Sequence, residues 1–470
     1  MNCYYFGGIK TEKLMKKSPS LSIYMCIFCL IFFSGCQSSV KKEKRSQIDS
    51  SLVSQKATIQ DVEQGIRANI DAQIKAGNGY FTFWNDSIEL SLKLVRVHTE
   101  YLSVLGSNEF FACVDLATEN GDVYDVDFFL EGTVGDMKVT QTDVHKLNGK
   151  PYYAWEQGDD KIWHTVSVEN AGSELLGVIE SADRFTFTYE VQLPELSESA
   201  EIWLPLAQSD SFQKVDILTI DTPVEHKLLT EGENKNSILF LKLMPEHAHD
   251  KIMIQYQVQR IEKSAYIEET FNPKKYLKAT SLSPVGDRFE AISSAIIESK
   301  QADTPLMRAR ALYDYIIDNM RYAKEGIYGT GDANYACDSK SGNCTEFHSF
   351  FISLARSAGI PSRFAVGASI PSERNEGGID GYHCWAEFYA EGKWWPIDIS
   401  EANKYTPLAT YYFGHHPANR IEFSRGRDLR PDPLPQSGPI NFLAYPIFEI
   451  GGEPAYVETT FSFKRATSKI

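Results

Sequence analysis

Hydrophobic residues first recur at helical spacing between residues 57 and 77. The apolar positions of this stretch are Ile59, Val62, Ile66, Ile70 and Ile74. They recur every three or four residues, as on the buried face of an amphipathic helix. Thr58, followed by Asp61 three residues later, is a helix-start signal, and Gly77 can end the helix. The pattern therefore predicts a helix that opens the first domain.

Short apolar-rich runs, several of which alternate with polar residues as strands do, follow in two groups. The first group covers 88–98, 110–116 and 123–130. Together with the helix it predicts a domain of one helix and an antiparallel sheet over residues 57–165. The second group predicts an immunoglobulin-like β-sandwich over residues 175–264. Its strands are 185–191, 201–206, 215–220, 237–243 and 252–259. Neither domain shows a constellation of catalytic residues, so a scaffold or binding role is expected for both.

The pattern changes again after residue 264. Thr304 and Pro305 open a helix, since a capping hydroxyl precedes a proline at the first helical position. Helical and then strand patterns follow, which predicts an α+β domain over residues 265–435. The remaining residues, 436–470, are expected to form strands that pack on this core. The whole chain is thus predicted to be an α+β multidomain protein.

The N-terminus carries a targeting pattern. After Lys16 and Lys17, residues 21–33 form an apolar run that is too short to span a bilayer comfortably. The sequence Phe33-Ser34-Gly35-Cys36 then resembles the lipobox of bacterial lipoproteins. It predicts a lipoprotein signal peptide at 1–35, lipidation of Cys36 and a flexible tether at 36–56. The alternative is an uncleaved membrane anchor. Either interpretation places the remaining chain outside the cytoplasm, anchored to a bacterial membrane in the cell envelope.

Charge and cysteine content exclude several classes of protein. The formal net charge is −16, and no basic stripe offsets it, so nucleic-acid binding is not expected. Four cysteines lie beyond the lipobox: Cys113, Cys337, Cys344 and Cys384. They are too few for a disulfide scaffold, although one bridge is compatible with them. A catalytic thiol among them has to stay unpaired.

The first candidate catalytic residue is Cys344. A turn sequence at 341–343 runs into an apolar helix that starts at this cysteine. Unpaired backbone N–H groups and the helix dipole stabilise a thiolate at such a position and lower the pKa of the thiol. The same N–H groups can receive an oxyanion.

The second and third candidates, His383 and Asp398, lie on two strands joined by a turn. If residue 390 pairs with residue 393, residue 383 lies opposite residue 400. His383 and Asp398 then share one face of the hairpin as diagonal neighbours, ~7–8 Å apart at the backbone. A slip of one residue would place them on opposite faces. Pro396 cannot donate to a strand ladder, so its strand is expected at an edge or with this residue facing outward.

A cysteine, a histidine and an aspartate in this order form a nucleophile, a base and an orienting acid. The segments GNCTEFHSFFISLARSAGIPSRFAVG, YHCWAEFY and WWPIDIS, which contain these residues, resemble the transglutaminase-like superfamily of papain-like thiol enzymes. The resemblance covers roughly residues 290–430 and would make the chain a bacterial lipoprotein member of that group. It implies a papain-like α+β core that acts without a cofactor.

The resemblance also implies acyl transfer on peptide or protein amides. Cys344 would attack the carbonyl and form a thioester, His383 would move the proton, and Asp398 would hold the imidazole. The backbone N–H of Cys344 would bind the oxyanion with one further donor, for which Tyr328 and Tyr322 are candidates. Hydrolysis is favoured over cross-linking, because water is always present as an acceptor. The alternative is a non-catalytic surface binding module with the same core.

Two competing interpretations involve other side chains near the motif. His348, one helical turn after Cys344, is a rival base, but a structural role is favoured because the helix does not aim it at the outer side of the sulfur. Cys337, Cys344, His383 and Cys384 together resemble a zinc ligand set. They lack a CxxC pair, so no metal site is predicted.

Overall fold

The computed structural model describes residues 57–465, apart from 86–87, 100–101, 106–107, 158–162, 168–174, 176, 271, 325 and 405–407. The predicted signal peptide at 1–35, the lipid site Cys36 and the tether at 36–56 lie outside the described residues. Within the described part, no helix is both long enough and apolar enough to cross a membrane.

Helix α1 (Ile59–Ala76) confirms the first predicted element. The Thr58 hydroxyl accepts a hydrogen bond from the Asp61 N–H (3.2 Å), and the Asp61 carboxylate accepts one from the Thr58 N–H (2.7 Å). This reciprocal capping satisfies backbone groups that would otherwise lack partners. Residue 77 caps the other end, as expected. The inward face of the helix carries Val62, Ile66 and Ile70, which are fully buried.

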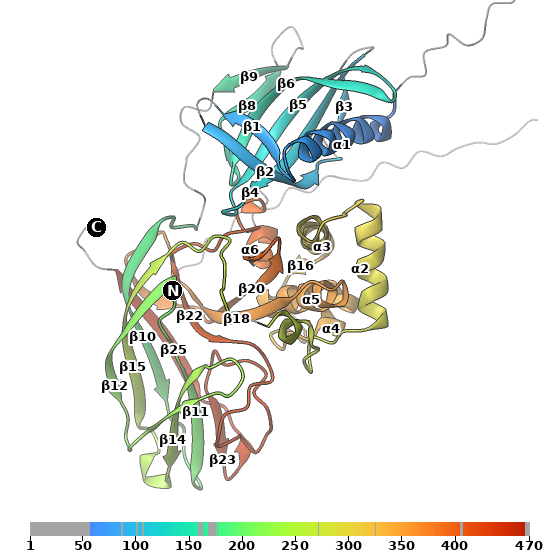
Figure 1. The fold of residues 1–470 in the computed structure, drawn as a ribbon. Coiled ribbons are helices and arrows are strands. Elements are labelled where there is room, and N and C mark those ends of the chain that lie inside the picture. Colours follow the sequence, from blue (N-terminus) through green and yellow to red (C-terminus); the bar gives the residue numbers. More distant parts are fainter. Residues whose placement is uncertain are drawn as a thin grey trace, which may run out of the picture. The chain divides into compact units, whose positions relative to one another are not determined.

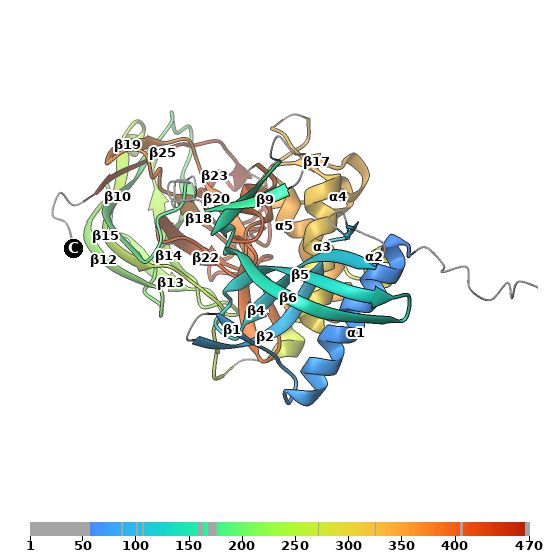
Figure 2. The same cartoon turned by 90° about the horizontal axis from the view of Figure 1, so that it is seen from above.

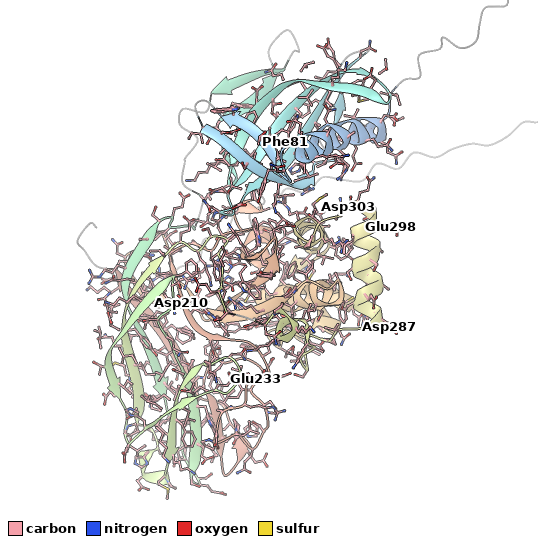
Figure 3. The ribbon with its side chains drawn as sticks, viewed as in Figure 1. Phe81, Asp210, Glu233, Asp287, Glu298 and Asp303 are labelled. Carbon is pink, nitrogen blue, oxygen red and sulfur yellow. The ribbon has the colours of Figure 1, made fainter. Side chains whose placement is uncertain are left out.

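The α1 helix lies across a mainly antiparallel sheet (Figures 1 and 2). The strand order is β1-β2-β4-β5-β6-β7, and β3 pairs with β4. Phe81 of β1, labelled beside the helix in Figure 3, packs edge-on against Phe128 in this interior (5.8 Å between ring centroids). The bounds of the strands, including a separate β8–β9 hairpin, are β1 (Phe81–Asn85), β2 (Ile88–Val97), β3 (Ser103–Val104), β4 (Glu109–Thr118), β5 (Val123–Thr133), β6 (Asp136–Leu147), β7 (Lys150–Pro151), β8 (Tyr153–Gln157) and β9 (Trp163–Ser167).

Two five-stranded sheets follow, with orders β12-β15-β10-β25-β19 and β13-β14-β11-β23-β24. Their inner faces share a hydrophobic core of aromatic and aliphatic side chains. The immunoglobulin-like topology of this region stays a prediction. The bounds are β10 (Ala182–Gln192), β11 (Ala200–Leu206), β12 (Gln213–Asp221), β13 (Lys227–Thr230), β14 (Ser237–Leu243), β15 (Lys251–Ile261), β19 (Glu376–Ile379), β23 (Ile447–Ile450), β24 (Glu453–Pro454) and β25 (Glu458–Arg465).

The C-terminal strands complete sheets that begin earlier in the chain. Residues 436–470 were expected to pack on the domain at 265–435. β25 pairs on one side with β19 of that range and on the other side, along its whole length, with β10, while β23 pairs with β11. The physical reason is edge pairing: β10 and β11 each have a second side that needs a hydrogen-bonded neighbour. The strands of the 175–264 region are thus completed by segments from far along the chain.

The remaining residues form helices packed on a four-stranded sheet of order β21-β20-β18-β22. β21 is an edge strand, as Pro396 required. Helix α5 lies against β18 and β20 (Figure 1). Short 3₁₀ turns lie at Pro245–His247 and Pro273–Leu277. The bounds are α2 (Asp287–Ser299), α3 (Pro305–Asn319), β16 (Arg321–Tyr322), α4 (Ala333–Ser339), β17 (Ser341–Gly342), α5 (Cys344–Ser357), β18 (Ser362–Ser369), β20 (His383–Ala390), β21 (Lys393–Ile397), α6 (Ile399–Lys404) and β22 (Arg420–Arg425).

Candidate active site

Cys344 is the first residue of helix α5, as its sequence context predicted. Asn343 caps the helix, and its side-chain oxygen accepts a hydrogen bond from the Thr345 N–H (2.8 Å). The N–H groups of the first turn have no partners within the helix, so they and the helix dipole favour negative charge at this point. The residue is only 2% exposed. A sulfur anion here would be held in a site with little water.

Glu346 ties a neighbouring loop to this helix start. Its carboxylate accepts hydrogen bonds from the backbone N–H groups of Asn343 (3.0 Å), Gly329 (3.1 Å) and Gly331 (2.7 Å). The side chain is fully buried. Gly331 adopts a positive φ of 67°, which favours glycine. The loop at 329–331 is therefore fixed beside Cys344 by one buried acid.

We expect Glu346→Gln to destabilise the protein by about 1–3 kcal/mol, because an amide nitrogen would face a backbone N–H and leave it unpaired. Urea unfolding followed by fluorescence measures the change. The exposed Glu290→Gln on helix α2 is the matched control, and its effect should stay within about 0.5 kcal/mol. Equal effects of the two substitutions would contradict the role given to Glu346.

The hairpin register brings His383 and Asp398 together. Ala390 pairs with Lys393, which confirms the predicted register. His383 starts β20, and Asp398 directly follows β21. The His383 Nε2 atom lies 2.6 Å from the Asp398 Oδ2 atom. With Nε2 on the carboxylate, the other ring nitrogen is left for Cys344, which is among the groups that raise the pKa of His383.

Asp398 is a fully buried carboxylate with a complete set of partners. Its Oδ1 atom accepts hydrogen bonds from the Ser400 hydroxyl (2.9 Å) and the Glu401 N–H (3.1 Å). Its Oδ2 atom accepts from His383 and from the Arg420 guanidinium (2.6 Å each). Burial alone would raise the pKa of Asp398, but the charges of His383 and Arg420 hold that pKa well below its usual range. The Asp398 carboxylate is therefore ionised.

The charges of the site favour a thiolate–imidazolium pair. A hydrogen bond from the Cys384 thiol, together with the hydrogen bond and charge of His383, lowers the pKa of Cys344 well below its usual range, although burial opposes this. Burial lowers the pKa of His383, but Asp398 and the hydrogen bond to Cys344 outweigh it and raise that pKa to about 9. Near neutral pH the sulfur is thus negative and the imidazole positive, as acyl transfer requires.

Cys384 lies beside Cys344, and the sequence did not indicate that it influences this thiol. Burial and the adjacent Cys344 raise the pKa of Cys384 well above its usual range. Its sulfur lies 3.7 Å from the Nδ1 atom of His348, and its neutral S–H is the first of the groups that lower the pKa of Cys344. All four cysteines of the described residues are free thiols, so the structure contains no bridge among them.

Arg420 is a second residue of the candidate site that the sequence analysis did not identify. It lies on β22, is fully buried, and its guanidinium stacks 4.9 Å from the centre of the Trp385 ring. Together with its bond to Asp398, this contact fixes the acid behind His383. Nothing in the sequence around Arg420 shows that this cation reaches the aspartate across the sheet.

The contacts of His348 support a structural role for this residue. Its Nδ1 atom lies 2.7 Å from the carbonyl oxygen of Cys344, and its Nε2 atom lies 3.1 Å from the N–H of Ile399. The first contact needs a proton on Nδ1, and the second needs a bare Nε2, so the ring is neutral. Burial also lowers the pKa of His348. Both nitrogens serve the backbone, which disfavours His348 as the base.

The two tyrosines proposed as oxyanion donors have different environments. Tyr328 lies in the surface loop and is 40% exposed. Tyr322 packs against Phe347 of α5 (6.0 Å between ring centroids), and burial and the Cys344 charge raise its pKa. Tyr382 is a further candidate: its hydroxyl lies 3.4 Å from the Asn343 amide, and burial and Cys344 raise its pKa as well. The second oxyanion donor remains a prediction, with Tyr322 and Tyr382 better placed than Tyr328.

The cysteine-rich set considered as a zinc site does not converge. Cys337 belongs to helix α4, whereas Cys344 and Cys384 belong to α5 and β20. Among the described residues, these three cysteines and His383 do not form a cluster of ligand atoms able to hold one ion.

We expect two different pH profiles from this one site. Alkylation of Cys344 by iodoacetamide needs only the thiolate, so its rate should rise through the low pKa of Cys344 and stay high in alkali. The amide hydrolysis expected from the sequence would also need the His383 proton for the leaving amine. That proton is present below the raised His383 pKa and lost as the pH rises through about 9, so hydrolysis should decline there.

The thiol of Cys337, which is also buried, is the internal standard for alkylation, and peptide mapping separates the two sites. In His383→Ala, alkylation of Cys344 should begin only at a higher pH, because the imidazolium no longer stabilises the thiolate. Superimposable alkylation profiles for wild type and His383→Ala would rule out the ion pair.

Comparison with known proteins finds one family model that matches part of this chain, and the matched part contains Cys344, His383 and Asp398. Residues 291–399 match the model of the transglutaminase-like superfamily. An uncharacterised protein of Haemophilus influenzae is 26% identical over 320 residues, which cover 57% of this chain and 86% of that protein. A solved structure described as a "putative cysteine protease" from Cytophaga hutchinsonii is 13% identical, with a TM-score of 0.42, and covers 62% of this chain and 93% of that one. The periplasmic domain of TgpA from Pseudomonas aeruginosa is 14% identical, with a TM-score of 0.27, and covers 50% and 93%. With such low TM-scores, neither structure lends support to a particular activity.

Proposed function

Because residues 291–399 form a transglutaminase-like domain, we propose that this protein is a thiol-dependent enzyme that transfers acyl groups from peptide or protein amides. The observation that carries the proposal is the position of His383: its Nε2 atom lies 2.6 Å from Asp398 Oδ2, and its charge helps to lower the pKa of Cys344. A thiolate at a helix start, an imidazolium beside it and a buried acid behind it are the parts that thioester chemistry requires.

The proposed reaction begins with attack of the Cys344 thiolate on an amide carbonyl carbon. The carbonyl oxygen becomes an oxyanion that the Cys344 N–H can bind. His383 gives its proton to the leaving nitrogen, the C–N bond breaks, and a thioester remains. Neutral His383 then takes a proton from water, the hydroxide attacks the thioester, and the carboxylic acid leaves as Cys344 regains its thiolate. Asp398 keeps the ring in the orientation that both steps need.

One experiment distinguishes the possible acceptors. The protein is incubated with casein and a fluorescent primary amine. Mass spectrometry then follows new peptide termini, conversion of glutamine to glutamate, and amine incorporation. We expect hydrolytic products to exceed amine incorporation. The Cys344→Ser variant is the blank for all three products. Labelling of Cys344 without turnover on any readout would favour the alternative, a non-catalytic binding module.

We further propose that the protein is anchored by lipid at Cys36 and faces outside the cytoplasm of a bacterial cell. The lipobox-like sequence before Cys36 supports this. In cells given a labelled fatty acid, the wild-type chain should carry the label and sediment with membranes. Cys36→Ala should carry none. Equal labelling of both chains would contradict the lipid site.

A further inference from the structure

The N-terminal sheet has one face that apolar packing does not explain. Its other face packs against α1 through side chains such as Val114 and Val126. The opposite face carries buried groups that can bind protons or metal ions, namely His98, Cys113, Asp115, Asp125 and Asp127. Buried carboxylates are costly unless a cation or hydrogen-bond donors compensate them. Lys146 and Arg310 supply part of this compensation, through Asp125 and Asp115 respectively.

Strand pairing brings these groups to one point. Cys113 of β4 lies directly opposite Asp127 of β5, and Asp115 lies opposite Asp125. The N–H of His98, just after β2, donates to the Cys113 carbonyl (2.9 Å), so His98 joins the same rows. One ligand atom each of His98, Cys113 and Asp125 lies within 4.8 Å of the others. A nitrogen, a sulfur and an oxygen donor thus converge from three neighbouring strands.

The contacts within the cluster show which atoms face one another. The Cys113 sulfur lies 2.6 Å from Asp125 Oδ1, and the Lys146 ammonium lies 3.0 Å from Asp125 Oδ2. The Cys113 thiol donates its proton to Oδ1. That proton links sulfur and oxygen at the place where a metal ion would bind both. Lys146 occupies only the other carboxylate oxygen.

Side chains around His98, Cys113 and Asp125 make contacts of the kind that orient metal ligands in proteins. His98 Nε2 lies 3.2 Å from Asp115 Oδ1, and Asp115 Oδ2 lies 2.9 Å from the buried Arg310 guanidinium. Histidines that bind metals commonly hold a carboxylate in this way, which orients the ring. On the other side, Asp127 accepts a hydrogen bond from the Tyr153 hydroxyl (2.7 Å). The donor groups are thus positioned by neighbours from several elements.

We propose that His98, Cys113 and Asp125 bind a divalent transition-metal ion of the Zn²⁺ type in the N-terminal domain. Sulfur and imidazole donors select such an ion over Mg²⁺ or Ca²⁺, which prefer oxygen ligands. Metal–ligand bonds of about 2.0–2.3 Å place donor atoms less than about 4 Å apart in a tetrahedral site, so small side-chain rotations suffice. The Cys113 proton passes to solvent as the metal–sulfur bond forms.

A second convergent set borders this site. Asp125, Asp127 and His145 also offer ligand atoms within 4.8 Å of one another, and the set shares Asp125 with the first. It lacks a sulfur donor, and its histidine is only partly buried. We therefore assign the ion to the set that contains Cys113. The inferred role is structural: the ion would tie the segment after β2 to β4 and β5, independently of the proposed acyl transfer.

The test uses the full chain after chelator treatment, titrated with Co²⁺ and then with Zn²⁺. A thiolate-bound Co²⁺ gives a sulfur-to-metal charge-transfer band, and Zn²⁺ should displace it. We expect the band in wild type and in Cys344→Ser, and its loss in Cys113→Ser. His98→Gln keeps the thiol, and it should weaken Co²⁺ binding by more than about 100-fold, since even outer-shell changes cost 10- to 100-fold.

Circular dichroism of each metal-free variant shows whether it is folded, and Zn²⁺ should raise the unfolding temperature of wild type but not of His98→Gln. Absence of the band in folded wild-type protein overturns the proposal. A band that survives in Cys113→Ser but disappears in Cys344→Ser also overturns it, because the ion would then bind at the candidate active site. Neither result depends on whether the protein has amidase activity.

Discussion

Replacement of Cys344 by serine is expected to reduce amide hydrolysis by about 10⁴- to 10⁶-fold, because loss of a nucleophile leaves only binding and oxyanion stabilisation. A serine hydroxyl beside His383 has a far higher pKa than the thiol, so no comparable anion forms near neutral pH. His383→Ala should have an effect of similar size, since the thiolate and the proton for the leaving amine are both lost. Product formation from casein, measured by mass spectrometry, gives the rates.

Cys337→Ser is the matched control for that experiment. Cys337 is also a buried free thiol in the same region of the chain, 7% exposed, but it lies on another helix, α4. Its replacement should leave the rate within about twofold of wild type, because no reacting atom is touched. If Cys344→Ser kept more than a few per cent of wild-type activity, another residue would have to be the nucleophile.

Replacement of Arg420 by methionine is expected to destabilise the protein by about 3–5 kcal/mol, the usual cost of removing one partner of a buried ion pair. Arg420→Lys keeps the positive charge but not the planar group that lies over Trp385, so it should lose less. Urea unfolding compares the two variants with wild type.

Arg420→Met should also change how amide hydrolysis falls off at acid pH. Arg420 helps to hold the pKa of Asp398 well below its usual range. A carboxylate with a lowered pKa stays ionised until the pH falls through that value. Without Arg420 the pKa rises, so hydrolysis should be lost at a higher pH than in wild type. A purely structural role would lower stability and leave this fall-off at the same pH, which is the outcome that would contradict positioning of Asp398 by Arg420.

Local sequence patterns predicted the elements that depend on short-range physics. The Thr58–Asp61 capping box, the start of α5 at Cys344 and the pairing of Ala390 with Lys393 all follow from backbone hydrogen bonding within a few residues. The register of that hairpin in turn placed His383 and Asp398 on one face. The predicted proximity of the histidine and the aspartate therefore rested on strand parity and turn length, and the 2.6 Å contact agrees with it.

Local patterns could not predict which distant strands pair with each other. The alternation in residues 458–465 predicts a strand but not its partner, and β25 pairs with β10, more than 260 residues earlier in the chain. Arg420 likewise reads as one basic residue in a strand until the sheet brings it to Asp398. Which edges and which charges meet is decided by the packing of whole elements, because many pairings satisfy the same local pattern.

By itself, the sequence thus determined the helix start that favours a Cys344 thiolate, the hairpin parity of His383 and Asp398, and the likeness to the transglutaminase-like superfamily. Only the tertiary structure decided what surrounds them: the Cys384 thiol on the sulfur and Arg420 on the acid. It also decided that donors from separate strands meet in the N-terminal sheet. The reason is common to all three: electrostatic and ligand contacts act over a few ångströms in space, regardless of separation along the chain.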